Sequence, residues 1–170
     1  MNNNNVLIVG IDPANVQTAI IVESVKENKI ILKGIFPNEE LGSVISEVNR
    51  LAIDREAKVH IGIEMIASYG MAVGATVFET CVTIGRLLQI CEDYFGQTPQ
   101  RIFRKDVKMC LCHTMKAKDT NIRQALIDIY GIPGTKKNPN PYYNDIEERM
   151  SKDLWAALGV LHYYKTEILK

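Results

Sequence analysis

The amino-acid sequence predicts an α/β fold, in which a mixed five-stranded sheet of three antiparallel strands followed by two parallel strands is flanked by helices. Two observations support this fold class. Residues 6–36 contain three apolar, β-rich segments joined by short turns, which is typical of an antiparallel meander. After residue 38, stretches with helical periodicity alternate with two short strands. This order predicts one sheet with helices packed on its faces.

The first strand is predicted from a near-continuous apolar run over residues 6–11, which is typical of a buried strand. The run delivers a carboxylate, Asp12, into a predicted turn that contains Pro13. A strand that is buried and then exposes an acid is one way of holding a metal ligand still. Asp12 and Pro13 are equally consistent with the cap of a hairpin, so this stretch alone leaves the role of Asp12 open.

Two further strands, a helix and a fourth strand follow. Residues 18–25 and 29–36 are rich in β-branched and apolar residues, which predicts the second and third strands. Apolar residues then recur at spacings of three and four over residues 39–54, as in an amphipathic helix. Residues 58–65, KVHIGIEM, alternate like a strand that ends near a second acid, Glu64.

The segment after Glu64 begins with glycines and is predicted to tighten into a long helix from Gly74 to Phe95, ended by Gly96. We expect the apolar face of this helix to comprise Val73, Val77, Cys81, Ile84, Leu88, Cys91 and Phe95. Residues 100–104 then predict a short fifth strand.

The last third of the chain is predicted to hold helices and one loop. A basic helical turn is expected over residues 105–112 and a helix over 119–130. Residues 131–144 include three prolines and two glycines, which predicts an exposed loop. The closing helix is predicted over residues 145–169 and carries a third candidate acid, Asp153, immediately before an apolar stretch.

The composition is that of an ordinary globular domain. A chain of 170 residues with 46% hydrophobic and 24% charged residues predicts one domain, residues 1–170, with a core of its own. Its first five residues, MNNNN, are predicted to be a disordered start. Twenty basic and twenty acidic side chains cancel at pH 7. A neutral total neither attracts nor repels nucleic acid, so electrostatic arguments depend on where the charges lie.

The cysteines favour a reduced, cytoplasmic protein, because they form no finger-like pairs and no secretory signal precedes the first strand. Cys110, Cys112 and His113 lie close together and are one candidate metal set. A fourth ligand is not evident, and cysteine is commonly a small buried hydrophobe. No apolar run reaches the roughly 18 residues that span a bilayer, so we expect no membrane partner.

Three acids occupy comparable places in this layout. Asp12 follows the first strand, Glu64 ends the fourth, and Asp153 lies near the start of the closing helix. If the two strands are parallel neighbours, their carboxyl ends place Asp12 and Glu64 on one edge of the sheet, where open α/β sheets bind ligands. A helix packed across that edge would add Asp153. Simpler explanations exist, since Glu64 could pair with a surface lysine and Asp153 could lie on a solvated helix face.

Taken together, these segments resemble the RuvC family of Holliday-junction resolvases, within the ribonuclease H-like fold. The resemblance spans nearly the whole chain and rests on VGIDPANVQTAIIV, IGIEM, DVKMCLC and SKDLWAALGVLHYY, in that order. The segment GIDP alone could also open an actin-like ATPase domain, but 170 residues are few for the two lobes of such a domain.

The resemblance implies that Asp12, Glu64 and Asp153 are the catalytic residues and the ligands of two divalent cations, Mg²⁺ or Mn²⁺ as its substitute. Two such ions about 4 Å apart activate a water molecule and stabilise the leaving oxygen in an in-line phosphodiester displacement. Hard carboxylate oxygens suit both metals.

The sequence departs from the family pattern just before Asp153. Family members commonly carry an acid or a histidine one turn before the helix carboxylate, and that position here is Met150. Arg149 lies near the same predicted face. No upstream acid falls three or four residues before Asp153, the nearest being Asp145, Glu147 and Glu148. The site therefore works with three acids, receives an acid from the preceding loop, or is a weakened catalyst.

A basic segment between Arg101 and Gln124 is the candidate DNA-binding surface. It holds seven basic residues against two acidic ones, which suits phosphate contacts that position a duplex without reading its bases. A solvated helix face is the alternative. The resemblance places Lys108 on a basic position of the family, and places Asp119 where a second lysine is expected. The candidate contacts are Lys105, Lys108, Lys116, Lys118 and Arg123.

Aromatic residues add a second kind of candidate contact. Tyr69 follows Glu64 where the family often presents an aromatic side chain that wedges into the junction, although ordinary packing is the favoured explanation. Tyr142 and Tyr143, in the proline-rich loop, are the alternatives for a DNA contact.

The sequence thus predicts a metal-dependent, structure-selective DNA endonuclease that resolves four-way junctions, as a phage-type member of the family. Two symmetric nicks need two active sites, so we expect a homodimer formed through the helix 74–95. One alternative is a nuclease for other branched or flapped DNA. Another is a non-catalytic junction-binding protein, which is credible because of Met150.

Overall fold

The computed structural model describes the chain except for residues 1–4, 69, 71, 136 and 144–148. Its five strands form one sheet in the order β3-β2-β1-β4-β5. The first two pairs are antiparallel and the last two are parallel, which confirms the predicted mixed sheet. The strands are β1 Val6–Pro13, β2 Gln17–Ser24, β3 Lys29–Pro37, β4 Lys58–Met65 and β5 Gln100–Phe103.

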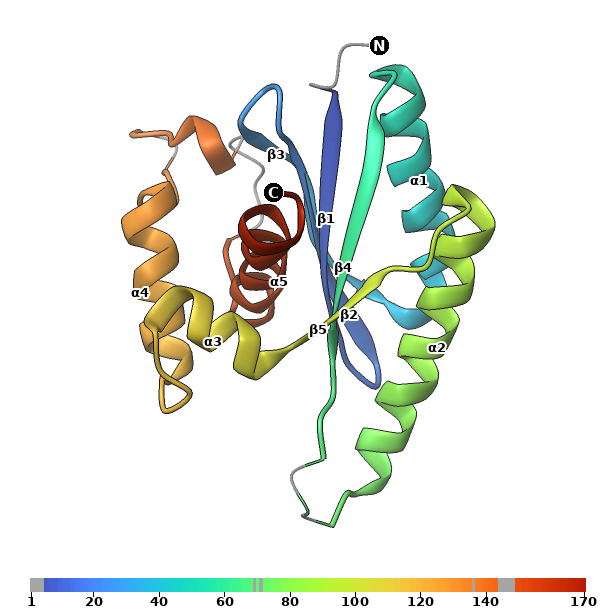
Figure 1. Cartoon of the computed structure of the whole chain (residues 1–170). Helices are drawn as coiled ribbons and strands as arrows, with labels where there is room; N and C mark the ends of the chain where they lie inside the picture. Colours follow the sequence, from blue (N-terminus) through green and yellow to red (C-terminus); the bar gives the residue numbers. More distant parts are fainter. Residues whose placement is uncertain (1–4, 69, 71, 136, 144–148) are drawn as a thin grey trace.

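The helices form two layers, one on each face of the sheet (Figure 1). The first layer contains α1 Leu41–Asp54, preceded by the short turn η1 Asn38–Glu40, and α2 Ala75–Phe95. On the other face α5 Lys152–Tyr163 lies across the strands and continues into the π-helical turn η3 Tyr164–Ile168, with α3 Arg104–Cys112, α4 Asp119–Tyr130 and η2 Pro141–Tyr143 around it.

The alternation of side chains along β1 explains why two helical layers are needed. Ile8 packs into the core under α5, whereas Leu7 and Val9 pack into the core under α1 and α2. Both faces of the strand are therefore buried, as the near-continuous apolar run predicts. The prediction that the apolar residues of the closing helix belong to the core is also confirmed, since Trp155, Leu158 and Leu161 are buried.

Two glycines let α5 approach the sheet closely. Gly10 of β1 and Gly62 of β4 lie side by side in the parallel register. A Cβ atom at Gly10 would lie 2.2 Å from the carbonyl oxygen of Ala157 and 2.7 Å from the Cβ of Leu161, both on α5. At Gly10 the helix backbone thus rests on bare strand backbone, whereas at Gly62 the side chains of Val160 and Tyr164 fill the space that a Cβ atom would take.

The ends of several elements differ from the sequence-based prediction. Asp12 does not lie in a turn, because β1 continues and pairs Asp12 with Ala19 and Pro13 with Thr18 of β2. The pairing of β1 with β4 ends at Ile11, so the missing N–H of Pro13 removes no ladder bond on that side. The turn itself covers residues 14–16.

The closing helix begins later than predicted, at Lys152, because Ser151 caps it by accepting a hydrogen bond from the backbone N–H of Leu154 at 3.3 Å. Met150 and Arg149 therefore precede the helix and do not lie one turn before Asp153 on its face. Met150 instead packs against the core under α5.

The buried face of α2 is also rotated from the predicted one. Cys81 and Val73 are exposed, and the buried face is formed by Thr80, Thr83, Ile84, Leu87 and Cys91. The two threonines tolerate burial because their hydroxyls donate to backbone carbonyls one turn earlier, those of Thr76 at 2.8 Å and Glu79 at 3.2 Å.

At the amino end, the predicted disordered start falls mostly on residues outside the described ranges. Its last residue, Asn5, accepts a hydrogen bond from the Lys58 N–H at 2.9 Å and donates one to the Arg55 carbonyl at 2.7 Å. Within the described residues, no helix is long and apolar enough to cross a membrane.

Candidate functional site

The parallel pairing of β1 and β4 brings two of the three candidate acids to one edge of the sheet. Ile11 and Ile63 are partners in the register, and both point into the core under α1 and α2. The residue that follows each of them points to the opposite face by strand alternation. Asp12 and Glu64 therefore project side by side from the sheet on the side covered by α3 and α5.

The third acid, Asp153, reaches this edge from the first turn of α5. The amino terminus of a helix is its positive end, so a carboxylate is favoured there. Because α5 packs on the face toward which Asp12 points, its first turn carries Asp153 into the electrostatic neighbourhood of Asp12. Three separate elements thus deliver one acid each.

The electrostatic consequence is clearest at Asp12. Burial, then repulsion from Glu64 and a smaller repulsion from Asp153, raises the pKa of Asp12 to about 7, against opposing attraction from Arg104 and Lys152. Within the described part of the chain, the Asp12 carboxylate has no ion pair. Burial also raises the pKa of Glu64, and Arg104 opposes that change.

An ion pair that the sequence did not predict joins the site. Arg104 donates through Nη1 to Oε2 of Glu64 at 3.2 Å and through Nη2 to Oδ1 of Asp119 at 2.6 Å. Lys152 Nζ lies 3.6 Å from the other oxygen of Asp119. The hydrogen bond from Arg104 lowers the pKa of Asp119. Sequence reasoning had placed Arg104 in the basic segment only.

The position of Arg104 follows from the same strand-end rule that located the acids. β5 is parallel to β4 and pairs Ile102 with Glu64, so the residues after β5 emerge at the same edge. Arg104 is the first residue of α3, and the start of that helix is fixed by Asp106, which accepts the backbone N–H of Phe103 at 3.3 Å. A search for polar residues after every parallel strand would have found it.

The donor chemistry of the site fits a hard divalent cation. Carboxylate oxygens are the ligands that Mg²⁺ and Mn²⁺ prefer, and a cation would relieve the repulsion that raises the pKa of Asp12. The spacing is not that of an assembled centre: among the described residues, no group of three Asp, Glu, His or Cys side chains is placed to hold a metal ion. Among the described residues, Cys110, Cys112 and His113 are likewise not placed together as such a group.

A buried polar network holds the turn that follows Asp12. The Asn38 side chain donates to the Ala14 carbonyl at 2.9 Å and to the Thr83 hydroxyl of α2 at 3.1 Å, and accepts from Thr18 at 2.8 Å. The backbone N–H of Asn38 donates to the Val16 carbonyl at 3.0 Å. This network ties the β1–β2 turn to α2, and no local sequence pattern indicates it.

The candidate DNA-binding residues lie around this edge on α3, α4 and the loop between them. Lys105, Lys116, Lys118 and Arg123 are exposed, and Lys108 is half-buried. The Lys105 ammonium lies 5.7 Å from the centre of the Phe103 ring, and the Arg123 guanidinium lies 5.6 Å from the centre of the Trp155 ring. Lys108 is close enough to Glu64 to lower the pKa of its carboxyl. Tyr69 lies outside the described residues.

The other two candidate aromatics are not available to DNA. Tyr142 and Tyr143 are buried, so the prediction of an exposed loop is wrong for this part of it. Tyr142 donates to Oε2 of the buried Glu23 at 2.9 Å, and Lys165 Nζ lies 2.6 Å from Oε1 of the same carboxylate. The Tyr142 ring also stacks on Tyr130, with 4.3 Å between centroids. These contacts hold the loop against the sheet.

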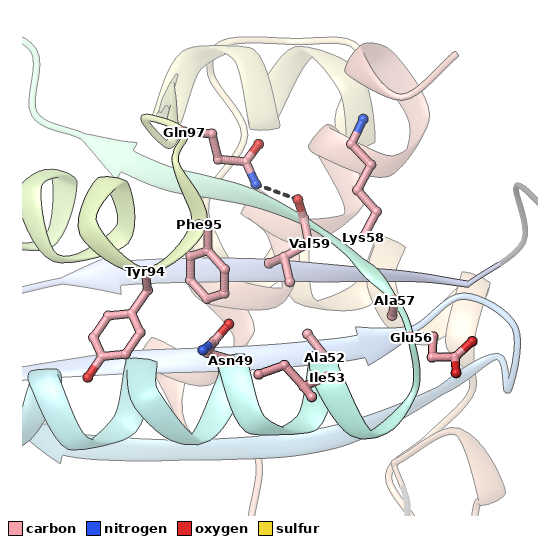
Figure 2. A pocket seen from close by; sticks show the side chains of 10 residues that line it. All are labelled: Asn49, Ala52, Ile53, Glu56, Ala57, Lys58, Val59, Tyr94, Phe95 and Gln97. Carbon is pink, nitrogen blue, oxygen red and sulfur yellow. Dashed lines mark hydrogen bonds between the residues drawn. The ribbon is translucent and has the colours of Figure 1, made fainter. Parts of the chain in front are cut away.

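A hollow of about 440 Å³ lies at the opposite end of β4 from Glu64 (Figure 2). It opens between the last turns of α1 and α2, and the Gln97 side chain crosses it to donate to the Val59 carbonyl at 2.6 Å. Since β4 rises about 3.3 Å per residue, this hollow is roughly 20 Å from the acids. It is not part of the candidate site. Its lining residues are Asn49, Ala52, Ile53, Glu56, Ala57, Lys58, Val59, Tyr94, Phe95 and Gln97.

Comparison with solved structures identifies the fold. RuvC of Thermus thermophilus, in a structure of its complex with a Holliday junction substrate, aligns with a TM-score of 0.66 over 94% of this chain and 92% of that chain, at 16% identity. A second structure of Thermus thermophilus RuvC aligns with a TM-score of 0.61, over 94% and 95% of the two chains, at 16% identity. No protein-family model and no curated protein matches the sequence. The predicted RuvC-like, ribonuclease H-like fold is thereby confirmed.

Proposed function

We propose that this chain, which has the fold of RuvC, is a metal-dependent, structure-selective endodeoxyribonuclease of the RuvC family that resolves four-way DNA junctions. One observation carries the proposal. Three elements deliver Asp12, Glu64 and Asp153 to one edge of the sheet, where the other two acids add to the burial that raises the pKa of Asp12 to about 7. Acids that repel each other in a buried setting are the arrangement that a divalent cation neutralises.

Asp12, Glu64 and Asp153 would hold two divalent cations per site, either Mg²⁺ or Mn²⁺. When bound, such ions would activate water and stabilise the leaving oxygen of a phosphodiester. The residues of the chain supply the setting for this chemistry. Asp12 and Glu64 are fixed by paired strands, and Asp153 by a capped helix whose positive end faces the same edge.

Exposed basic residues beside the acids would hold the DNA. Lys105, Lys116, Lys118 and Arg123 are free to meet backbone phosphates, and Lys108 lies nearer to the acids. Such contacts fix the position of the duplex without reading its sequence. We propose Tyr69, five residues after Glu64, as the aromatic contact to the junction.

We also propose that the protein acts as a homodimer formed through α2. The outer face of α2 leaves large apolar side chains in water, since Phe78 is 61% exposed and Val82 is 60% exposed. Cys81 lies between them and is exposed. A short bis-maleimide should therefore cross-link two copies through Cys81, and Phe78→Glu should abolish both the cross-link and the dimer in sedimentation. A monomeric wild-type chain would contradict this proposal.

A non-catalytic junction-binding protein is the second candidate function. Two observations favour it: Glu64 is already paired with Arg104, and Met150 packs into the core where an acid or a histidine was expected. Such a protein would bind four-way junctions without forming product in Mg²⁺.

The test is cleavage of a synthetic four-way junction, with a linear duplex and a flapped duplex of the same sequence as controls. We expect the wild-type chain to nick the junction symmetrically in Mg²⁺ or Mn²⁺, and Asp12→Asn to bind the junction equally well without cutting it. Equal cutting by both proteins would reject the proposed mechanism. Binding by both without any product would favour the second candidate, and preferential cutting of the flapped duplex would reassign the substrate.

A further inference from the structure

The ion pair between Arg104 and Glu64 places a side-chain cation on one of the acids proposed to bind metal. The two side chains are largely buried, with 25% of Arg104 and 19% of Glu64 exposed. Asp119, the second partner of Arg104, is 46% exposed. Arg104 is therefore shared between one acid inside the site and one acid at its margin.

This sharing has a geometric consequence. The guanidinium donates to Oε2 of Glu64, so it takes up acceptor capacity that a metal ion bound to this carboxylate would use. The shorter contact of Arg104 is the one to Asp119, at 2.6 Å against 3.2 Å to Glu64. If Glu64 turned to a metal ion, Arg104 would keep its shorter bond. Arg104 would then still be paired with Asp119.

An arginine side chain suits an exchange of partners better than a lysine side chain does. The planar guanidinium carries five N–H donors, so one edge stays on Asp119 while the others change partner. The donors released from Glu64 would lie among Lys108 and Lys152, at the edge where the proposed DNA backbone passes. A phosphate oxygen is a natural acceptor for them.

We propose that Arg104 is a built-in competitor of the metal: it occupies Glu64 in the metal-free protein, withdraws onto Asp119 when a divalent cation takes Glu64, and then offers its freed donors to a DNA phosphate. The inference rests on the proposed function. It gives Arg104 a role toward the metal through its contact with Glu64, and a role toward the DNA through its freed donors. It also implies that metal and DNA strengthen each other's binding, reciprocally.

The test measures Mn²⁺ binding to the intact chain without DNA, by isothermal titration or by loss of the free Mn²⁺ paramagnetic signal. Measurements are made at about pH 8.5, so that protons compete little for the acids. Arg104→Gln should bind Mn²⁺ roughly tenfold more tightly than the wild type, because one charge-assisted contact to Glu64 no longer has to be broken. Arg104→Lys should lie between them, since it keeps the charge without the fork.

The matched control is Lys108→Gln, which removes a positive charge that acts on Glu64 without forming an ion pair with it among the described residues. This variant should tighten Mn²⁺ binding by less than about threefold. An equal gain in Arg104→Gln and Lys108→Gln would overturn the inference, because long-range charge would then explain both. So would unchanged or weaker binding in Arg104→Gln.

The proposed function fails separately. If neither the wild type nor Arg104→Gln binds Mn²⁺, the metal site itself is absent and both proposals fall. If the wild type binds Mn²⁺ and Glu64→Gln does not, the site stands, and the comparison of Arg104→Gln with Lys108→Gln alone decides the role of Arg104. Thermal unfolding of each variant confirms that the measurements are made on folded protein.

Discussion

Of the glutamates that form ion pairs, Glu23 and Glu64 have the least exposed side chains, and their surroundings differ in one respect. Glu23 is fully buried on β2, and each of its oxygens has its own partner, Lys165 at 2.6 Å and Tyr142 at 2.9 Å. Glu64 is 19% exposed, one of its oxygens is paired, and its cation is shared with Asp119. Beside Glu64 lies Asp12, without an ion pair among the described residues.

The difference separates a carboxylate with a structural role from one that we propose to bind metal. At Glu23 the donors balance the acceptors, so the cluster stabilises the fold and has no use for a ligand. Beside Glu64, burial and then repulsion from Glu64 and Asp153 raise the pKa of Asp12, and attraction from Arg104 and Lys152 offsets them only in part. A buried ion pair therefore indicates function only when charged groups beside it are left without partners.

The largest expected effect tests the functional side of this comparison. Glu64→Gln should lower junction cleavage by at least about 1,000-fold, because losing a metal ligand forfeits several kcal/mol of transition-state stabilisation. Its free energy of unfolding should change little, since the replaced carboxylate was held by a single shared cation. Single-turnover cleavage and urea unfolding measure the two quantities.

Glu23→Ala should show the opposite behaviour. It leaves the Tyr142 hydroxyl and Lys165 without their carboxylate, so the free energy of unfolding should fall by about 2 to 3 kcal/mol, less than for a fully buried pair because Lys165 is 27% exposed. Cleavage per folded molecule should match the wild type. Glu23→Gln, which still accepts from Tyr142, serves as the milder control. If Glu23→Ala lost cleavage without losing stability, Glu23 would also have a functional role, and the distinction between the two glutamates would fail.

The pH dependence of stability should also differ between the regions. Because folding raises the pKa of Asp12 from 3.8 to about 7, the folded state holds the proton more tightly than the unfolded state does. This contribution is complete below about pH 4 and is lost as pH rises through about 7, with a size of roughly 4 kcal/mol. Urea unfolding from about pH 4.5 to 8 should show this decline in the wild type, and Asp12→Asn should lose it.

The smallest effect concerns the helix that carries Asp153. Ser151→Ala removes the cap of α5 and should cost about 1 kcal/mol of stability, whereas Ser151→Asp should restore it. If the cap also positions Asp153, Ser151→Ala should lower kcat more than it changes KM. An unchanged kcat would assign Ser151 to stability alone.

The sequence supported the strands, the mixed character of the sheet and the place of Asp12 and Glu64 near strand ends, because each rests on a local pattern with a fixed period. A buried strand that ends on an acid is readable without knowing what surrounds it, and Asp12 and Glu64 were found in this way. Arg104 met the same rule at the end of β5, but its place in a basic run suggested a surface role. Its pairing with Glu64 depends on a register that no local pattern contains.

Other features could not be predicted because tertiary contacts decide them. The proline-rich loop was expected in solvent, yet Tyr142 and Tyr143 fold back into the core, because aromatic rings gain more from burial than the loop backbone loses. On α2, Thr80 and Thr83 take the buried side with their hydroxyls bonded to the helix itself, and Phe78 and Val82 are left outside. Both faces of α2 carry apolar residues, so hydrophobic periodicity alone cannot tell which face is buried against the core and which is exposed.

The pair of glycines under α5 fixes one dimension of the site. Side chains in a core can repack, but two backbones in direct contact cannot come closer, so Gly10 sets a hard stop between the strand that bears Asp12 and the helix that bears Asp153. Asp12 and Asp153 thus belong to two elements whose backbones are in direct contact. The proposed site would then adjust to metal or DNA through the rotamers of Glu64 and Arg104. A single added methyl group, Gly10→Ala, would act as a spacer between the strand that bears Asp12 and the helix that bears Asp153.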